Sequence, residues 1–347
     1  MFDLKRLLLI GSALFGLLVV AAAVAVVQIS SFLNTPVDVD DAGANFEIVA
    51  GSSFRKVSDE LAEKGIISSS GVLRVYARWT GHAATAQAGD YLIKHGTTPA
   101  ELLDQFTSGA VKLYSFTIIE GWNRWDLLRA LHDDPNIDAK LTDEDWPSLL
   151  EELGAGLNHP EGLFLPETYR FPRNTSDREV LVQAYDLMQE VLAQEWEERA
   201  QGLPFATPYE ALILASIVEK ETARGDERPR ISGVFKRRIE KRMRLQTDPT
   251  VIYGIGPGFN GNLTRRDLQT DTSYNTYTRR GLPPTPIALP GRAAINATLH
   301  PANGEELYFV ATGLGDGGHA FSTTKEEHDE AVAAYLRQLR QLRQQRK

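Results

Sequence analysis

An unbroken apolar run near the start of the chain is its strongest pattern. Residues 7–27 read LLLIGSALFGLLVVAAAVAVV and carry no charge. A helix that rises about 1.5 Å per residue would take them across a hydrocarbon core of about 30 Å. Lys5 and Arg6 precede the run, and the next basic residue is Arg55. This asymmetry predicts one transmembrane helix with a cytoplasmic N-terminus. A cleaved signal peptide is the alternative, although its apolar region is usually shorter.

Changes in polarity and periodicity divide the rest of the chain. The stretch NTPVDVDDAGAN is polar and acidic and predicts a linker. After it, Phe54, Val57 and Leu61 recur at helical spacing behind a short apolar strand, and the following segments predict a second helix, a strand and a further helix. We therefore expect an α+β protein with these parts: cytoplasmic start 1–6, transmembrane helix 7–29, linker 30–45, a small βααβ module 46–110, and a larger mixed α+β domain 111–347.

Composition narrows the class of partner and of chemistry. The chain has 347 residues, which suits two domains, and its formal net charge of −9 argues against nucleic acid as a partner. It contains no cysteine, which excludes disulfides and thiolate metal sites. Its seven histidines show no metal-ligand spacing, so we expect neither a metal nor another cofactor.

A second apolar pattern predicts a buried helix that ends in two glutamates. Thr207, Pro208 and Glu210 form the sequence of a capping box with proline at the first helical position. Residues 211–218 (ALILASIV) are apolar on nearly all sides and indicate a core helix. At about 100° per residue, two positions separate the next acidic side chains by about 200°. Glu219 and Glu221 must therefore point to different sides.

The neighbours on each face distinguish the two carboxyl groups. Glu221 shares a face with the bulky Leu214, Ile217 and Val218. Apolar surroundings raise a carboxyl pKa and keep the group protonated near neutral pH, as a general acid requires. Glu219 would then be a supporting partner, held by Arg224. The alternative is that both glutamates are solvated carboxylates at a helix end.

Two later segments, MRLQTDPTVIYGIG (243–256) and TSYNTYTRRGLPPTPIALPG (272–291), combine aromatic rings with hydroxyl and amide groups. A sugar ring has apolar faces and a polar edge, so this mixture suits a glycan-binding cleft. The candidate substrate-binding residues are Gln246, Thr247, Asp248, Tyr253, Tyr274, Asn275 and Tyr277.

Four motifs, LASIVEKET, RLQTDPTVIYGIG, YNTYTRRGLPP and ALPGRAAINATLHP, closely resemble those of the endolytic murein transglycosylases of the YceG-like family. The layout is also similar, since that family has a basic cytoplasmic start, one membrane span, a LysM-like module and a catalytic domain. The resemblance therefore implies that the small module is LysM-like. It also implies a single-pass protein of the cell inner membrane with its catalytic domain on the periplasmic, extracytoplasmic side.

The resemblance further implies an activity. Such enzymes cleave the β-1,4 bond between N-acetylmuramic acid and N-acetylglucosamine within nascent peptidoglycan strands, leave 1,6-anhydro-muramyl ends, and so terminate glycan elongation. One glutamate acts first as acid and then as base, and the family pattern places it at Glu221. Gln246, Asn275 and Tyr277 are then substrate-orienting residues. Peptidoglycan synthases are the implied partners.

Two alternatives remain from the sequence. A hydrolase would need a second carboxylate beside Glu221, for which Asp248 and Glu167 are candidates. A membrane-anchored glycan-binding scaffold would need no catalytic carboxyl group at all.

Overall fold

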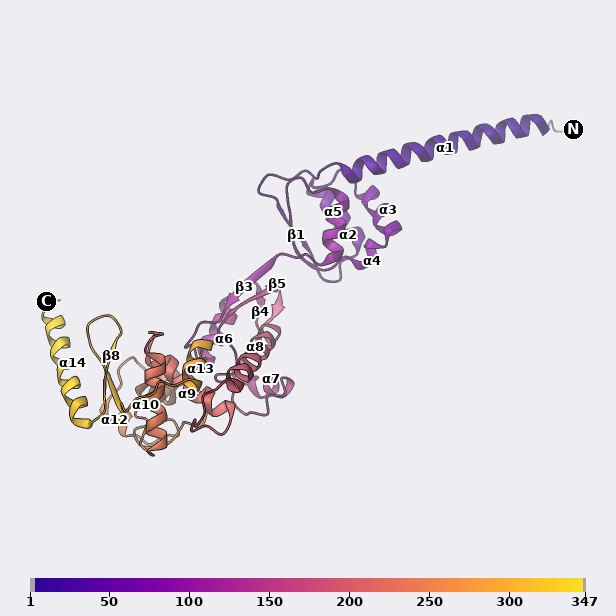
Figure 1. Cartoon of the computed structure of the whole chain (residues 1–347). Coiled ribbons are helices and arrows are strands. Elements are labelled where there is room, and N and C mark those ends of the chain that lie inside the picture. The colour runs from indigo at the N-terminus through magenta and orange to yellow at the C-terminus, as the bar shows by residue number, and fades with distance from the viewer. Residues whose placement is uncertain (1–3, 346–347) are drawn as a thin grey trace. The chain divides into compact units, whose positions relative to one another are not determined.

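The computed structural model describes residues 4–345, and the chain within it forms two compact units. Residues up to 114, together with 171–173, belong to the first unit, and the other described residues belong to the second. Both units consist mainly of helices, and their short strands form two-stranded sheets (Figure 1). The fold is therefore mixed α+β, as the sequence predicts. Residues 1–3 of the predicted cytoplasmic start lie outside the described part of the chain.

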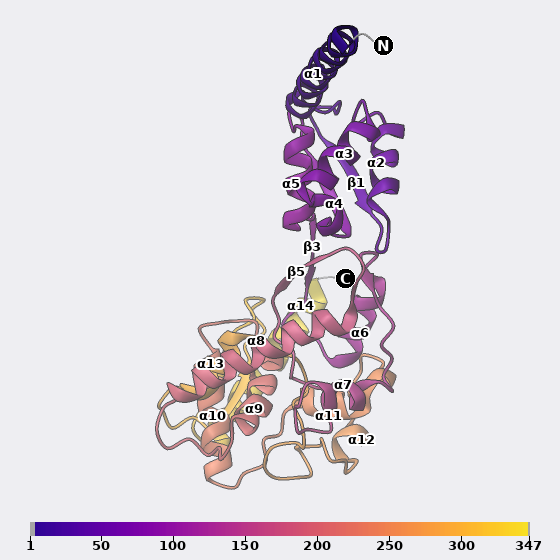
Figure 2. The ribbon, with the colours of Figure 1, turned by 90° about the vertical axis from the view of Figure 1, so that its right-hand side faces the viewer.

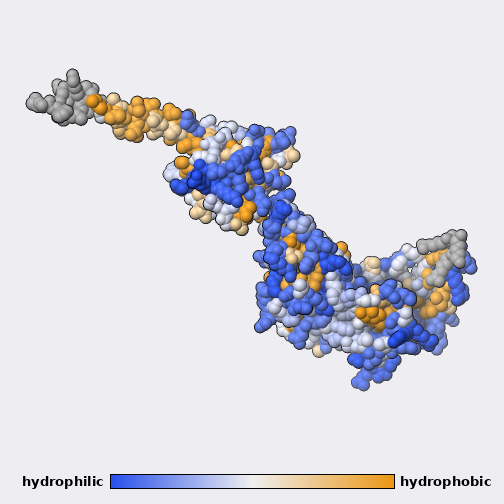
Figure 3. Space-filling model, turned by 180° about the vertical axis from the view of Figure 1, so that it is seen from behind, coloured by the Kyte–Doolittle hydropathy of each residue, from blue (hydrophilic) through white to orange (hydrophobic). Residues whose placement is uncertain are grey.

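Helix α1 (Leu4–Asn34) contains the apolar run. Its segment Ile10–Asn34 is long and apolar enough to cross a membrane, and the hydrophobic window within it is not buried by the protein. In Figure 3 the projecting segment is coloured mostly as hydrophobic. These features are compatible with the predicted membrane anchor. Part of the predicted linker is structured, because α1 continues to Asn34 and Val37 is buried.

The rest of the first unit contains the predicted strand, two helices, strand and further helix in that order. Its elements are β1 (Ala44–Ile48), α2 (Phe54–Glu63), α3 (Ser70–Thr80), α4 (His82–Thr85), β2 (Gly89–Ile93) and α5 (Pro99–Ser108). Strands β1 and β2 pair antiparallel. Its core is mostly aliphatic and includes three aromatic rings, with the Phe106 ring 4.7 Å from that of Tyr91 and 6.0 Å from that of Phe46. These packed side chains give the small module its own hydrophobic core.

The second unit is built around a few central helices. Its elements, with β3 and β5 at the unit boundary, are β3 (Leu113–Thr117), α6 (Arg124–Asp133), β4 (Ile137–Asp138), α7 (Trp146–Glu152), β5 (Thr168–Pro172), β6 (Thr175–Ser176), α8 (Asp177–Glu197), α9 (Pro208–Glu221), α10 (Arg228–Glu240), α11 (Asp248–Ile255), η1 (Gly256–Gly258), α12 (Arg265–Gln269), α13 (Arg292–Leu299), β7 (Tyr308–Ala311), β8 (His319–Ser322) and α14 (Lys325–Gln345). Strands β7 and β8 form an antiparallel hairpin, whereas β4 and β6 pair in parallel.

Helix α9 is the central helix of this unit. Every residue from Ala211 to Val218 is buried, and α8, α10, α11 and α13 all pack against the helix (Figure 2). The Thr207 hydroxyl accepts the Glu210 amide at 3.2 Å, which caps the helix as predicted. The second half of the predicted capping box is wrong, because the Glu210 carboxylate accepts the Ala206 amide rather than that of Thr207.

Candidate active site

The two glutamates leave the C-terminal end of α9 toward different surroundings. The helix ends at Glu221 because Thr222 takes an extended conformation with φ −148°. Glu219 lies against α10 and the start of α13, whereas Glu221 lies against the segment that precedes α11. The helical spacing therefore predicts the divergence correctly.

Glu221 lines a cavity of about 480 Å³. The cavity is bounded by the segment before α11, the β7–β8 hairpin and α14. Its lining mixes apolar groups such as Leu245, Phe309 and Val332 with the charged groups of Asp248 and Arg238. This combination suits a polar substrate with apolar faces.

Burial raises the pKa of Glu221 to about 7. The Thr247 hydroxyl donates to one carboxylate oxygen and lowers the pKa in part, while the nearby Asp248 raises it. The positive charge of Arg238 lowers it again. A carboxyl group with this pKa is divided between its acid and base forms near neutral pH, which suits a group that must act as both.

A frame of hydroxyl groups holds Thr247 in place. The Thr247 amide donates to the Thr276 hydroxyl at 3.1 Å, and the Thr250 hydroxyl donates to the Thr247 carbonyl at 2.8 Å. The Thr250 and Thr276 hydroxyls are themselves 2.9 Å apart. Thr247 is thus fixed from two chain segments and is almost completely buried. The donor to Glu221 is preorganised before any substrate arrives.

An acidic and a basic side chain complete the polar lining. Tyr277 donates its hydroxyl to the Asp248 carboxylate at 2.6 Å. Arg238 is buried on α10 and donates to the carbonyls of Leu245 and Leu307 at 2.7 and 2.6 Å. Within the described residues, no carboxylate lies at ion-pair distance from Arg238, so its charge remains available to the cavity.

Glu219 has a structural environment. Its side chain is only 5 % exposed and accepts from Arg228 at 2.9 Å and from the Gly291 amide at 3.1 Å. Burial raises its pKa, whereas the Gly291 amide and the Arg228 charge lower it. The predicted pairing with Arg224 is wrong, since Arg224 instead contacts Asp226. Glu219 therefore connects α9 to α10 and α13.

The structure brings together only some of the predicted substrate-binding residues. Gln246, Thr247, Asp248 and Tyr277 line the cavity together with Glu221. Tyr253, Tyr274 and Asn275 do not line it.

Each of these three residues has another partner. The Tyr253 hydroxyl donates to the buried carboxyl of Glu161 at 2.9 Å, and the pKa of Glu161 is raised to about 7 by its burial. Tyr274 packs on Tyr253 with ring centroids 5.0 Å apart. Asn275 is completely buried, donates to three backbone carbonyls, and accepts the Tyr277 amide at 2.8 Å.

Sequence reasoning missed Arg238 and gave His319 no place in the site, yet both line the cavity. A signal for Arg238 exists, because it follows Ile231, Val234 and Phe235 at helical spacing on the buried face of α10. His319 is held through its Nδ1 by the Glu227 carboxylate at 2.7 Å. That partner lies 92 positions away in the sequence, and its proximity follows only from the fold.

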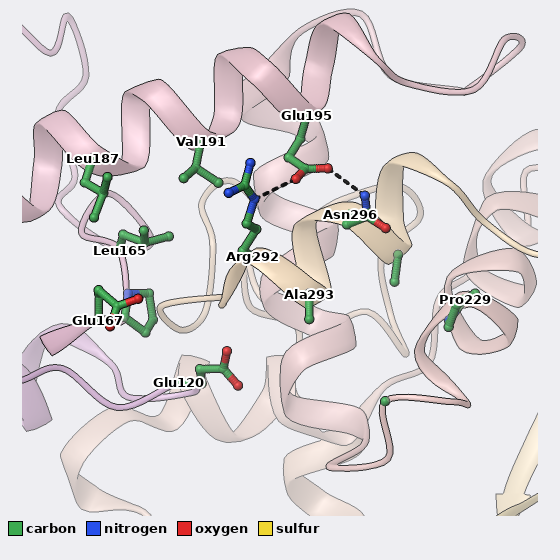
Figure 4. A pocket seen from close by; sticks show the side chains of 13 residues that line it. Glu120, Leu165, Glu167, Leu187, Val191, Glu195, Pro229, Arg292, Ala293 and Asn296 are labelled. Carbon is green, nitrogen blue, oxygen red and sulfur yellow. Dashed lines mark hydrogen bonds and ion pairs between the residues drawn. The ribbon is translucent and has the colours of Figure 1, made fainter.

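A second cavity, of about 700 Å³, lies on the side of the unit formed by α8 and α13. Figure 4 shows Glu120 and Glu167 at its border and a hydrogen-bonded network of Glu195, Arg292 and Asn296 on its wall. Glu167, a candidate second carboxylate of the hydrolase alternative, therefore lines a different cavity from Glu221, whereas Asp248 shares that of Glu221. Among the described residues, no group of three or more metal-ligating side chains is assembled.

Comparisons with known proteins agree on one family. The model of the family described as "YceG-like family" matches residues 46–334. A protein of Bacillus subtilis named endolytic murein transglycosylase is 30% identical over 322 residues, which cover 88% of this chain and 88% of that protein. A protein of the same name from Streptococcus pneumoniae is 27% identical and is matched over 83% of this chain. The match spans only 58% of that longer relative.

A solved structure is also similar. The crystal structure of a protein from Listeria monocytogenes described as yceG-like is 27% identical to this chain and superposes with a TM-score of 0.50. The match covers 84% of this chain and 99% of that one.

Proposed function

Because the chain belongs to the YceG-like family, we propose that it is an endolytic murein transglycosylase, the name that its curated relatives carry. Its substrate is the peptidoglycan glycan strand, which it cleaves at the β-1,4 bond between N-acetylmuramic acid and N-acetylglucosamine. The observation that carries this proposal is Glu221, a carboxyl group with a pKa of about 7 on the wall of a 480 Å³ cavity.

The reaction needs only one carboxyl group. Glu221 in its acid form gives its proton to the glycosidic oxygen as the bond from that oxygen to the muramyl C1 breaks. The muramyl C6 hydroxyl then attacks C1, and its proton passes to the Glu221 carboxylate. The products are a new N-acetylglucosamine end and a 1,6-anhydro-muramyl end. No water is consumed, and Glu221 regains its proton.

The neighbours of Glu221 support each half of this cycle. The Asp248 carboxylate lines the same cavity and stabilises the positive charge that develops at C1. Arg238 and the Thr247 hydroxyl favour the ionised form of Glu221 between the two proton transfers. Gln246 and Tyr277 border the cavity and orient the sugar. For Asn275, which is buried and fully hydrogen-bonded, we propose that it holds the loop that carries Tyr277.

The remaining proposals concern place and partners. Helix α1 anchors the chain in the cell inner membrane as a single span, with the N-terminus in the cytoplasm and the catalytic domain outside it. The βααβ module is LysM-like. Cleavage within nascent strands beside the membrane terminates their elongation, and peptidoglycan synthases are the partners of this step.

A hydrolase that uses Asp248 as its second carboxylate is the alternative that one observation favours, because Asp248 lines the same cavity as Glu221. It would leave reducing muramyl ends rather than anhydro ends. A glycan-binding scaffold would leave the strands uncut.

One experiment separates these possibilities. The full-length protein in detergent and its Glu221→Gln variant are each incubated with nascent, uncrosslinked strands, and the products are read by mass spectrometry. We expect anhydro-muramyl ends from the wild type and a decrease of about 10²–10⁴-fold in the variant, the usual contribution of a general acid–base group. Reducing ends would identify a hydrolase, and uncut strands that remain bound would identify a scaffold.

A further inference from the structure

A third cavity, of about 420 Å³, lies in the second unit and is bordered by two of the chain segments that also border the Glu221 cavity. Two pairs of consecutive residues have one member in each lining. Lys220 and Pro249 line the third cavity. Their sequence neighbours Glu221 and Asp248 line the Glu221 cavity. Consecutive Cα atoms are about 3.8 Å apart. The two cavities therefore flank the same two chain segments, the end of α9 and the start of α11.

The third cavity has an aromatic wall. Trp125 and Phe259 line it together with Tyr253, whose ring centroid lies 5.5 Å from that of Trp125. Gly256 is placed so that a Cβ atom there would stand 3.5 Å from the edge of the Trp125 indole. The absence of a side chain at this position leaves that edge free. An aromatic surface with polar groups around it is the kind of wall on which a sugar ring packs.

The charge of this cavity is unusual for an acidic protein. Lys220 and Arg129 contribute positive charges, and Asp126 contributes the one negative charge of the lining. Arg129 forms an ion pair with Asp126, so Lys220 is the cation of this lining that has no carboxylate partner among the described residues. Its ammonium group donates to the Gly121 carbonyl at 3.0 Å and is otherwise exposed. Of the described carboxylates, none pairs with Lys220, so this cation can accept an anionic ligand.

A muramyl unit offers the matching chemistry. N-acetylmuramic acid differs from N-acetylglucosamine by a lactyl ether, which carries a carboxylate when no peptide is attached. When a stem peptide is attached, the lactyl carboxylate becomes an amide and the carboxylates lie on the peptide. In both cases the muramyl unit brings an anion that N-acetylglucosamine lacks.

We propose that the third cavity binds the muramyl unit whose C1 belongs to the cleaved bond. The sugar packs against Trp125, and the carboxylate of this unit contacts Lys220. The proposal rests on the proposed function and deepens it. A peptidoglycan strand alternates two kinds of β-1,4 bond, and the enzyme must bring one kind to Glu221. Lys220 selects between the two alternating sugars and so fixes the register of the strand relative to Glu221.

The test measures binding without turnover. The full-length Glu221→Gln protein in detergent is titrated, by tryptophan fluorescence and by calorimetry, with three tetrasaccharides: chitotetraose, the peptide-free repeat of N-acetylglucosamine and N-acetylmuramic acid, and the same repeat with stem peptides. We expect the muramyl-containing ligands to bind about tenfold more tightly than chitotetraose, the difference that one charge-assisted contact gives. The two muramyl ligands separate a lactyl carboxylate from a peptide carboxylate as the anion.

Variants at Lys220 then test the residue. Lys220→Met, added to Glu221→Gln, removes the preference for muramyl ligands and leaves the affinity for chitotetraose unchanged, whereas Lys220→Arg retains the preference. Lys241→Met, at an exposed lysine beyond α10, is the matched control and changes neither affinity.

Other outcomes overturn the proposal. Equal affinities of the parent protein for all three ligands would exclude an anion subsite. If Lys220→Met lowered the affinity for all three ligands equally, Lys220 would act only by holding Gly121. Because the binding is read in an inactive protein, a wild type that produces reducing ends would refute the lytic chemistry and leave this result standing.

Discussion

Glu219 and Glu221, two positions apart at the end of α9, have opposite kinds of partner. Glu219 contacts a cation and a backbone amide, whereas Glu221 contacts the hydroxyl of Thr247. Burial raises the pKa of both groups, but Glu219 is enclosed by an ion pair and a backbone amide, whereas Glu221 lines a cavity. The same helix end thus supplies one carboxyl group for structure and, in the proposed mechanism, one for chemistry.

The raised pKa of Glu221 makes the stability of the protein depend on pH. Its pKa rises from 4.5 to about 7 on folding, so ionisation is disfavoured in the folded state. This cost is absent below pH 4.5, grows between pH 4.5 and 7, and is complete above 7. We expect Glu221→Gln to exceed the wild type in stability by about 1–2 kcal/mol at pH 8, a value reduced for partial exposure.

Thermal unfolding of both proteins between pH 4.5 and 8 measures this difference. A gap that stayed constant across the range would contradict a raised pKa at Glu221.

Two neighbours should shift the pH–activity profile in opposite directions. With Glu221 as the acid, kcat/KM falls above pH 7 in the wild type. Thr247→Val removes the hydrogen bond that lowers the pKa of Glu221, so the fall moves to higher pH. Asp248→Asn removes the charge that raises the pKa, so the fall moves to lower pH. The position of the alkaline limb, not the maximal rate, is the measurement, and shifts in the same direction would exclude Glu221 as the titrating group.

The buried pair of Glu219 and Arg228 should matter for stability. Arg228 is 11 % exposed, and Arg228→Met would leave a buried carboxylate unpaired at a cost of about 3 kcal/mol. Arg224→Met is the matched control, since Arg224 pairs with the exposed Asp226 and its loss should cost less than about 1 kcal/mol. Urea unfolding of both variants compares the two costs. Similar losses would show that the pair contributes no more than a surface contact.

Asn275 offers a test between a structural and a substrate-binding role. Asn275→Ala would remove three hydrogen bonds to backbone carbonyls and the acceptor of the Tyr277 amide, and we expect a loss of about 2–4 kcal/mol in unfolding free energy. Tyr277→Phe, which loses only the bond to Asp248, should keep its melting temperature within a few degrees and lose activity. A stable but inactive Asn275→Ala protein would instead place Asn275 in contact with the substrate.

The features that local sequence could predict are those that depend on helical geometry. The burial of α9 follows from the apolar residues 211–218, and the separation of Glu219 from Glu221 follows from their spacing. The partner of Glu219 could not be predicted in this way. The chain changes direction at Thr222, so the ion pair forms with Arg228, nine positions from Glu219 and beyond the turn, rather than with the nearer Arg224.

The roles of polar residues outside α9 were the least predictable. Tyr253 and Asn275 have the side chains of a glycan cleft, and the same groups also satisfy a protein's own buried polar atoms. Glu161, the partner of Tyr253, lies 92 positions away, and the carbonyls that receive the Asn275 amide belong to α12 and to Thr270 at its end. Sequence composition cannot distinguish these two uses, because the choice depends on which segments meet in the folded chain.

The hydroxyl at Thr247 has one more consequence for the proposed reaction. A hydroxyl can donate to a carboxylate and can equally accept from a carboxylic acid, so it remains a partner of Glu221 in both forms. The proton that leaves Glu221 returns to it within one turnover. Glu221 therefore returns to its acid form without exchanging a proton with solvent, and the enzyme can begin the next cleavage at once.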